Sequence, residues 1–302
     1  MTTVGNGKYT YDLVTDWAKF PEGEPTGVVC SVAVDGQGLV YVSQRIGSTV
    51  LVFDDSGNYI RSWDSVGISD PHGFYIADDV AYVADRGESV VLKCTLDGKI
   101  LQVIGERGMH SDTGCEKVGD VVLRPGGPFN FPSKLFPAPS GDLYVSDGYR
   151  NCQVHKFSVN GDLIRSWGEP GKTEPNQFHL PHSVLVTQDD LVYVCDRNNR
   201  RVQIFSLDGQ YVDMWTDLRR PTDIVVDKDG IFYISEYAVD GLPPRVSVVD
   251  KEGQVLSRWD SRSGHSLWVD SRGDIYLALS RGVRQTDPSL VNSVDKYVRR
   301  EP

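Results

Sequence analysis

A short apolar segment centred on a tyrosine recurs six times along the 302-residue chain. Its copies read LVYVSQR, VAYVADR, DLYVSDGYR, LVYVCDR, IFYISEY and DIYLALS. The tyrosines stand 41, 62, 49, 40 and 43 residues apart. A period near 40 residues, built from short paired strands, is typical of the blades of a β-propeller. The repeat therefore predicts an all-β fold of six four-stranded blades.

A second repeated element supports this count. The stretches GNYIRSWD, GDLIRSWG, GQYVDMWT and GQVLSRWD each follow a turn with glycine and end in tryptophan, and YDLVTDWAKF repeats the pattern near the N-terminus. Only GKILQVIGE departs, with Ile104 in place of tryptophan. We interpret the recurrent tryptophan as packing between neighbouring blades.

The two ends of the chain are predicted to meet in one blade. The copy after Tyr276 has no clear tryptophan strand, whereas residues 9–18 form such a strand without the strands that normally precede it. Residues 9–18 should therefore supply the outer strand of the last blade and close the ring, which removes the free sheet edges. We expect one domain over residues 1–302.

The composition narrows the function classes. A formal net charge of −11 argues against a nucleic-acid partner, since phosphate binding needs clustered Lys and Arg. The N-terminus has neither the basic nor the apolar region of a signal peptide, and no apolar run approaches 18 residues. The five cysteines are an odd number and show no CxxC pair. We therefore expect a cytoplasmic protein with no membrane partner.

One position of the repeat alternates between histidine and small residues. Ten or eleven residues before each tyrosine stand, in chain order, Ser31, His72, Ser133, His182, Thr222 and His265. Innermost strands line the central channel, and equivalent positions in every second of six blades lie about 120° apart around it. Three imidazoles converging there would form a metal site with open coordination positions, as in catalytic zinc sites, although imidazole also suits iron or copper. The alternative is that each histidine only caps the turn before its strand.

The ends of the second strands should lie near these histidines, because the two strands run antiparallel. They read Gln44-Arg45, Asp85-Arg86, Asp147-Gly148-Tyr149, Asp196-Arg197 and Glu236-Tyr237. Their arginines and tyrosines could bind a substrate carboxylate and transfer a proton, or could pair with acids on the rim. The aspartates are better interpreted as acceptors for backbone N–H groups of adjacent turns. A long insertion at 105–131 should lie on the same side and form a wall or lid.

The densest part of the repeat resembles a known family. The run VSDGYRNCQVHKFSVNGDLIRSWGEPG, followed by NQFHLPHSVLV and VCDRNNRRVQIF, resembles the NHL-repeat propeller of peptidyl-α-hydroxyglycine α-amidating lyases. The resemblance spans about residues 28–280 and is densest over 144–205. It implies that zinc in the central channel is bound by His72 in DPHG, His182 in LPHS and His265 in GHSL.

The resemblance also implies a reaction and three catalytic residues. The family cleaves the carbinolamide N–C bond of a C-terminal α-hydroxyglycine and releases an amide and glyoxylate. Its catalytic tyrosine lies in a DGY motif, which matches Tyr149, and one active-site arginine matches Arg197 in CDR; a second arginine, from the first blade, aligns best with Arg45. By this resemblance zinc polarises the substrate hydroxyl, Tyr149 takes its proton, and the arginines neutralise the carboxylate or developing oxyanion.

The chain also departs from the family. Ser266 follows His265 where the family has an aspartate that helps to hold a structural calcium ion, so calcium is not expected here. Two other functions stay open: hydrolysis or lyase chemistry on a different amide, lactone or hydroxy acid at the same three-histidine site, and a non-catalytic NHL propeller that binds a protein partner. The expected substrate is a small molecule or the C-terminus of a peptide, and the expected oligomeric state is a monomer.

Overall fold

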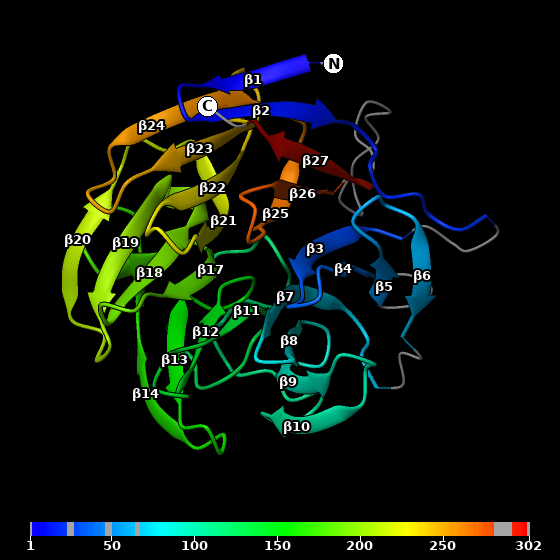
Figure 1. Ribbon diagram of the computed structural model, residues 1–302. Coiled ribbons are helices and arrows are strands. Elements are labelled where there is room, and N and C mark those ends of the chain that lie inside the picture. Colours follow the sequence, from blue (N-terminus) through cyan, green and yellow to red (C-terminus); the bar gives the residue numbers. More distant parts are fainter. Residues whose placement is uncertain (1, 23–26, 46–49, 64–66, 281–291, 301–302) are drawn as a thin grey trace. The chain divides into compact units, whose positions relative to one another are not determined.

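The described part of the chain folds into short strands, one three-residue 3-10 helix, and the turns and loops that connect them. The computed structural model describes residues 2–22, 27–45, 50–63, 67–280 and 292–300. It confirms the all-β fold with six four-stranded blades (Figure 1). The chain separates into two compact units, residues 67–221 and residues 1–66 together with 222–302.

The unit of residues 67–221 contains the second, third and fourth blades. The second blade is β7 (Pro71–Ala77), β8 (Val80–Asp85), β9 (Val90–Thr95) and β10 (Ile100–Ile104). The third is β11 (Pro132–Pro137), β12 (Leu143–Asp147), β13 (Gln153–Phe157) and β14 (Leu163–Trp167). The fourth is β17 (Pro181–Val186), β18 (Leu191–Asp196), β19 (Arg201–Ser206) and β20 (Tyr211–Trp215). A parallel pair, β15 (Glu169–Pro170) and β16 (Gln177–Phe178), and η1 (Arg197–Asn199) lie in the connections.

The other unit contains the first, fifth and sixth blades. The first is β3 (Val29–Val34), β4 (Val40–Gln44), β5 (Val50–Phe53) and β6 (Tyr59–Ser62). The fifth is β21 (Arg220–Val226), β22 (Phe232–Tyr237), β23 (Arg245–Val249) and β24 (Val255–Asp260), and its first two residues fall in the other unit. The sixth is β25 (Gly264–Val269), β26 (Ile275–Leu279), β27 (Ser293–Arg299) and β2 (Tyr9–Val14).

The N-terminal strand completes the sixth blade, as the sequence predicts. β2 pairs antiparallel with β27, with Tyr11 opposite Arg299. A further strand that the sequence pattern does not indicate, β1 (Thr2–Asn6), pairs with β2 and extends this sheet to five strands (Figure 1). The outer edge of the sixth blade is therefore covered by a segment of the same chain.

The recurrent tryptophans pack between blades, which confirms their predicted role. Trp167 at the end of β14 lies with its ring centroid 6.0 Å from that of Phe205 in the fourth blade. Trp259 in β24 lies 5.6 Å from Tyr297 in the sixth blade. Both tryptophans are 7% exposed, so each aromatic contact also buries a large apolar surface.

Gly209 precedes the outer strand of the fourth blade and lies against Trp167. It has a φ of +72°, and an added Cβ would come within 2.6 Å of the indole. Gly230 has a similar φ of +77° but no atom within 4 Å of that position. We expect Gly230→Ala to lower the free energy of unfolding by about 1–2 kcal/mol through backbone strain. Gly209→Ala should lower it by a further ~1–3 kcal/mol through overpacking, measured by chemical denaturation. Equal losses in the two variants would contradict the inference that Gly209 is required by its close contact with Trp167.

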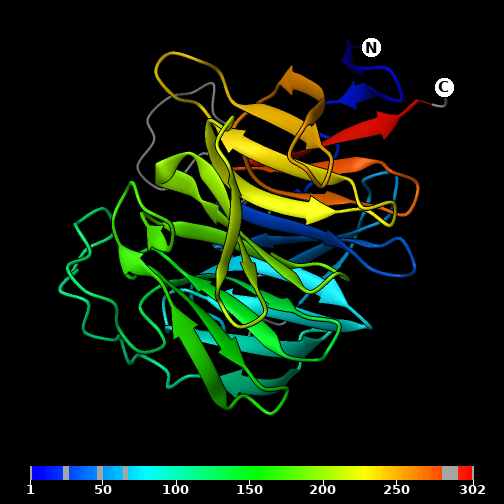
Figure 2. The ribbon, with the colours of Figure 1, turned by 90° about the vertical axis from the view of Figure 1, so that its left-hand side faces the viewer.

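The insertion at 105–131 is a long loop without strands, visible in Figure 2 as the teal segment that projects from its unit. Buried polar side chains hold it: Asn130 Nδ2 donates to the Ser111 carbonyl at 2.9 Å and Thr113 Oγ1 donates to the Arg150 carbonyl at 2.5 Å. The first contact closes the loop on itself, and the second ties it to the segment that follows β12.

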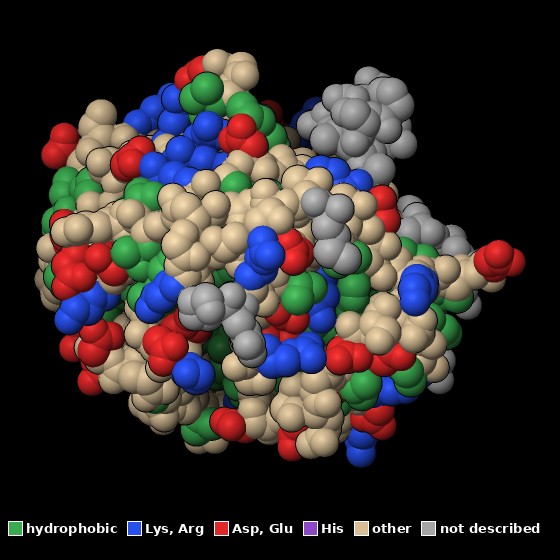
Figure 3. Space-filling model, turned by 45° about the horizontal axis from the view of Figure 1, so that its top comes forward, with side chains coloured by type: hydrophobic (Ala, Val, Ile, Leu, Met, Phe, Trp, Pro, Cys, Tyr) green, Lys and Arg blue, Asp and Glu red, His purple; other side chains and the backbone are tan. Residues whose placement is uncertain are grey.

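The surface carries charges of both signs. Lys and Arg side chains lie among Asp and Glu on the face in Figure 3. Among the described residues, no helix is long and apolar enough to cross a membrane.

Candidate metal centre

Each of the three predicted histidines lies at a β-bulge near the start of an innermost strand. In β17, Pro181 pairs with Asp196 and Ser183 with Cys195, so His182 between them has no partner residue. The same shift skips His265 in β25, and it skips His72 together with Gly73 in β7. A bulge turns a side chain out of the regular alternation of the strand, and here it does so at every histidine of the repeat.

The bulge corrects one assignment in the repeat. In the first blade the shift falls between Val29 and Ser31, so Cys30 is the equivalent of the histidines and Ser31 is the next residue. The contacts agree, because Cys30 Sγ lies 3.3 Å from the Ser43 carbonyl, as Ser133 Oγ lies 2.9 Å from the Ser146 carbonyl. The alternating partners of the histidines are therefore Cys30, Ser133 and Thr222, and the prediction of Ser31 was wrong by one residue.

Two of these alternating residues tie their blade to the next one. Ser133 Oγ donates to the carbonyl of Pro181 at 2.8 Å, and Thr222 Oγ1 donates to the carbonyl of Gly264 at 3.0 Å. Each acceptor is the residue directly before a histidine. The hydroxyl residues thus fix the backbone from which the imidazoles of His182 and His265 project.

The imidazoles are oriented by backbone carbonyls. His72 Nδ1 lies 2.6 Å from the carbonyl oxygen of Ser133, and His265 Nδ1 lies 2.6 Å from that of Cys30. A carbonyl oxygen only accepts, so Nδ1 carries the proton and donates it, and Nε2 keeps its lone pair. A hydrogen bond of this kind fixes the tautomer and ring orientation of a metal-binding histidine.

The acids at the ends of the second strands are structural, as the sequence favours. Asp85 accepts the backbone N–H groups of Ser69 at 2.8 Å and Asp70 at 3.0 Å, just before the strand of His72. Asp196 accepts the backbone N–H of His179 at 2.8 Å, just before the strand of His182. Burial raises the pKa of Asp196, and the hydrogen bond from the His179 N–H partly offsets the rise. Each acid therefore anchors the turn that leads into a histidine strand.

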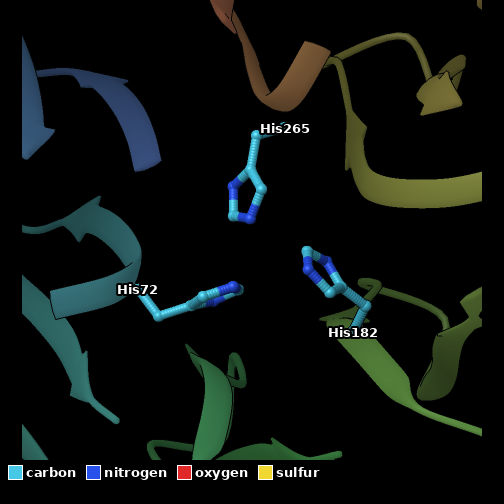
Figure 4. A group of neighbouring side chains, drawn as sticks. All are labelled: His72, His182 and His265. Atoms are coloured by element: carbon cyan, nitrogen blue, oxygen red, sulfur yellow. The ribbon is translucent and has the colours of Figure 1, made fainter. Parts of the chain in front are cut away.

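Tyr149 brings its phenol oxygen to His72 and His182, the two predicted metal ligands in its unit. Its Oη lies 2.8 Å from His72 Nε2 and 3.0 Å from His182 Nε2. The two imidazole rings turn toward one another, with centroids 4.8 Å apart (Figure 4). Both histidines are 2% exposed. The structure thus joins three residues, predicted from three separate blades, in one cluster.

Arg197 is the fourth predicted residue that belongs to this cluster. Its Nη1 lies 3.4 Å from Tyr149 Oη, and its guanidinium carbon lies 5.5 Å from the centroid of the Tyr149 ring. Arg197 follows Asp196 at the end of β18 and is 9% exposed. Arg197 therefore places a guanidinium group directly beside the Tyr149 side chain.

Arg86 is an arginine for which the sequence left open substrate binding or an ion pair with an acid on the rim, and which it did not single out as catalytic. Its guanidinium carbon lies 4.9 Å from the centroid of the Tyr149 ring, and Nε and Nη2 donate to Asp70 Oδ2 at 3.0 and 2.6 Å. Arg86 follows Asp85 as Arg197 follows Asp196, so the repeated Asp-Arg pair was the signal that could have identified it. Tyr149 therefore has a guanidinium within cation–π distance from both the second and the fourth blade.

The two remaining predicted residues lie in the other unit. His265 occupies the bulge of β25 and is 5% exposed. Arg45 follows β4 and is half-buried, and its backbone N–H donates to the Val28 carbonyl at 3.1 Å, just before the inner strand. Arg45 thus holds in the first blade the position that Arg86 and Arg197 hold in theirs.

His72 and His182, in one unit, and His265, in the other, each offer a ring nitrogen that could bind a metal ion. The donors fit such an ion. His72 and His265 keep a lone pair on Nε2, because Nδ1 of each donates to a carbonyl oxygen, and an imidazole lone pair is the donor that a metal ion binds. An all-imidazole donor set suits zinc and the later transition metals.

The other three histidines have different surroundings. His155 is buried between Asp147 Oδ2 at 3.2 Å and Ser166 Oγ at 2.7 Å. His110 Nδ1 lies 2.7 Å from Ser89 Oγ. Burial lowers the pKa of His179, and the positive charges nearby, Arg197 among them, lower it further.

Comparison with known proteins identifies the type of repeat. The family model for the NHL repeat matches residues 178–205, which cover the strand of His182 and the Asp196-Arg197 pair. NHL repeat-containing protein 3 of Homo sapiens is 30% identical over 298 residues, which are 90% of this chain and 82% of the human protein.

A second relative carries a named activity. Peptidyl-alpha-hydroxyglycine alpha-amidating lyase 2 of Drosophila melanogaster is 26% identical over 332 residues, which cover 95% of this chain and 75% of that protein. Among solved structures, a streptogramin B lyase aligns with a TM-score of 0.63 over 95% of this chain and 97% of its own, at 12% identity, which bears on the fold alone. From the repeat match and the shared length with the human relative, the chain belongs to the NHL-repeat family of β-propellers.

Proposed function

We propose that the protein is a zinc-dependent carbon–nitrogen lyase of the amidating-lyase type, which cleaves a carbinolamide into an amide and glyoxylate or acts on a closely related small substrate. One observation carries the proposal: a phenol oxygen lies within 3.0 Å of Nε2 of both His72 and His182 and within 3.4 Å of a guanidinium nitrogen of Arg197. The amidating-lyase relative from Drosophila melanogaster supports the reaction class.

His72, His182 and His265 would hold the metal through their Nε2 atoms. A zinc ion there supplies a Lewis acid that polarises an oxygen of the substrate. The carbonyl groups of Ser133 and Cys30 accept from Nδ1–H of His72 and His265, which fixes the orientation in which each imidazole would present Nε2 to the metal. The histidines would then be the metal ligands, and the residues that alternate with them, Cys30, Ser133 and Thr222, would fix the strands that carry the ligands.

Tyr149 would move the proton. As the phenolate, its Oη would take the proton of the substrate hydroxyl while the C–O bond becomes a double bond and the C–N bond breaks. The resulting phenol would then give a proton to the departing amide nitrogen. The proposed roles of Arg197 and Arg45 are to bind the substrate carboxylate and to stabilise the developing negative charge. Arg86, paired with Asp70, would keep the phenol ring in place through its contact with the ring face.

The same proposal covers the partners of the protein. A substrate with a carboxylate beside a carbinolamide, either a small molecule or the C-terminus of a peptide, fits guanidinium groups next to a metal. We propose that the protein works as a monomer and without nucleic acid, in keeping with its net charge of −11.

Glyoxylate release from α-hydroxyhippurate tests the proposal. We expect the zinc-loaded protein to release glyoxylate and benzamide in equal amounts, and the chelator-treated protein to release neither. Adding zinc back should restore the reaction. A protein that holds zinc but releases no glyoxylate would contradict the amidating-lyase reaction and leave hydrolysis or lyase chemistry on another amide, lactone or hydroxy acid at the same metal. A folded protein that binds no transition metal would exclude both enzymes and favour a binding propeller.

A further inference from the structure

A chain of buried hydrogen bonds runs beside His265 in the layer directly after the bulge. Once Cys30 is recognised as the equivalent of the histidines, Ser31, Asp223 and Ser266 all occupy the next position of their inner strands. Ser266 Oγ donates to Asp223 Oδ2 at 2.6 Å, and Ser31 Oγ lies 2.9 Å from Ser266 Oγ. Since Ser266 has only one hydroxyl proton, Ser31 is the donor in the second contact. This series of hydrogen bonds thus links the fifth, sixth and first blades.

Asp223 also binds the backbone on the far side of His265. Its Oδ2 accepts the N–H of Leu267 at 3.2 Å, two residues after the histidine. On the near side, Thr222 Oγ1 donates to the Gly264 carbonyl at 3.0 Å. The fifth blade therefore binds the strand of His265 through hydrogen bonds immediately before and after the bulge. His265 itself donates from Nδ1 to the Cys30 carbonyl at 2.6 Å.

The position of Asp223 is costly for a carboxylate. Asp223 is 3% exposed and Ser266 is 5% exposed. Removing a charged carboxylate from water is expensive unless hydrogen bonds compensate, and both donors from the sixth blade are spent on one oxygen, Oδ2. These two hydrogen bonds fix the strand segment Ser266–Leu267 relative to Asp223.

We infer that Asp223 is a positioning residue for His265: through Ser266 and the Leu267 N–H it holds the bulge in the conformation that presents His265 Nε2 to a metal ion. This inference rests on the proposed metal site. Asp223 does not touch the metal or the substrate, so its effect should appear in metal affinity before it appears in chemistry. Partners that orient metal ligands typically change affinity by about 10–100-fold.

The test is zinc binding, measured by competition with a chromophoric chelator, and the visible spectrum of the Co²⁺-substituted protein. We expect Asp223→Ala to weaken zinc binding by about 10–100-fold and to alter the Co²⁺ spectrum. Asp223→Asn, whose amide oxygen can still accept from Ser266 and Leu267, should recover most of the affinity. Ser266→Ala is a milder second variant, with an expected loss of several-fold to about 10-fold.

Asp227→Ala is the matched control, because Asp227 follows the same strand and accepts three hydrogen bonds, from Asp229 N, Ile231 N and Tyr233 Oη, away from His265. It should lower thermal stability without changing zinc affinity. Wild-type affinity in both Asp223→Ala and Ser266→Ala would overturn the inference. Loss of affinity in Asp227→Ala equal to that in Asp223→Ala would overturn it too, because the effect would then be one of general stability. If the wild-type protein binds zinc but releases no glyoxylate, the proposed reaction fails while this inference stands; if it binds no zinc, both fail.

Discussion

His182→Ala should abolish tight zinc binding. The residue is one of two histidines in its unit whose Nε2 atoms lie within 3.0 Å of the same phenol oxygen, and it is 2% exposed. Loss of a partner that merely orients a ligand weakens metal binding by about 10–100-fold, so loss of a ligand should weaken it by more than about 100-fold. Metal content after gel filtration in the presence of a weak chelator, together with a competition titration, measures the change.

Two further variants make this result interpretable. His182→Gln keeps the side-chain volume near Tyr149 and should lose zinc equally, which separates loss of the ligand from formation of a cavity. His110→Ala removes a histidine outside the cluster, one that contacts Ser89 Oγ at 2.7 Å, and should retain zinc. A His182→Ala protein that keeps its metal at wild-type affinity would remove His182 from the ligand set and with it the basis of the proposed enzyme.

The histidine pattern was visible in the sequence because a propeller repeats its register. Once the tyrosines fix the second strands, counting back leads to the start of each innermost strand, and the alternation of histidine with small residues follows. The same logic predicted that residues 9–18 complete the last blade. Segment β1 escaped prediction because TTVGN has neither a regular apolar alternation nor a copy elsewhere in the chain.

The bulge is what the sequence could not show. Side chains alternate between faces along a strand, so an error of one residue moves a side chain to the other face. Counting ten residues back from Tyr41 selects Ser31 and counting eleven selects Cys30, and only the paired registers of Val29 and Ser31 decide between them. The hydrogen-bond chain through Asp223 depends on that decision and was therefore also hidden.

Arg86 illustrates a different limit. Its Asp-Arg pair repeats that of Arg197, yet a position in a repeat does not tell whether a side chain turns toward the site or the rim. Here Asp70 accepts two hydrogen bonds from the guanidinium and directs it across the face of Tyr149. The contact between Arg86 and the Tyr149 ring also depends on the insertion at 105–131, because the Tyr149 N–H donates to the carbonyl of Phe131 at the C-terminal end of that insertion.

Tyr149→Phe should leave zinc binding intact and lower kcat for glyoxylate release by about 10²–10⁴-fold, the usual contribution of a positioned proton carrier. Phenylalanine keeps the ring that packs against Arg86 at 4.9 Å and Arg197 at 5.5 Å, so the variant removes one oxygen and little else. Steady-state kinetics with α-hydroxyhippurate, with zinc content measured on the same samples, separates chemistry from metal loss.

Tyr144→Phe supplies the control from the same blade. The Tyr144 hydroxyl donates to the Leu207 carbonyl at 3.0 Å, and its loss should affect stability but not turnover. A Tyr149→Phe enzyme with kcat within about 3-fold of wild type would show that the proton moves by another route. A Tyr149→Phe protein that loses its zinc would instead assign the hydroxyl to holding His72 and His182 in place. The outcome therefore decides whether the phenol oxygen between the two imidazoles carries a proton or only arranges the ligands.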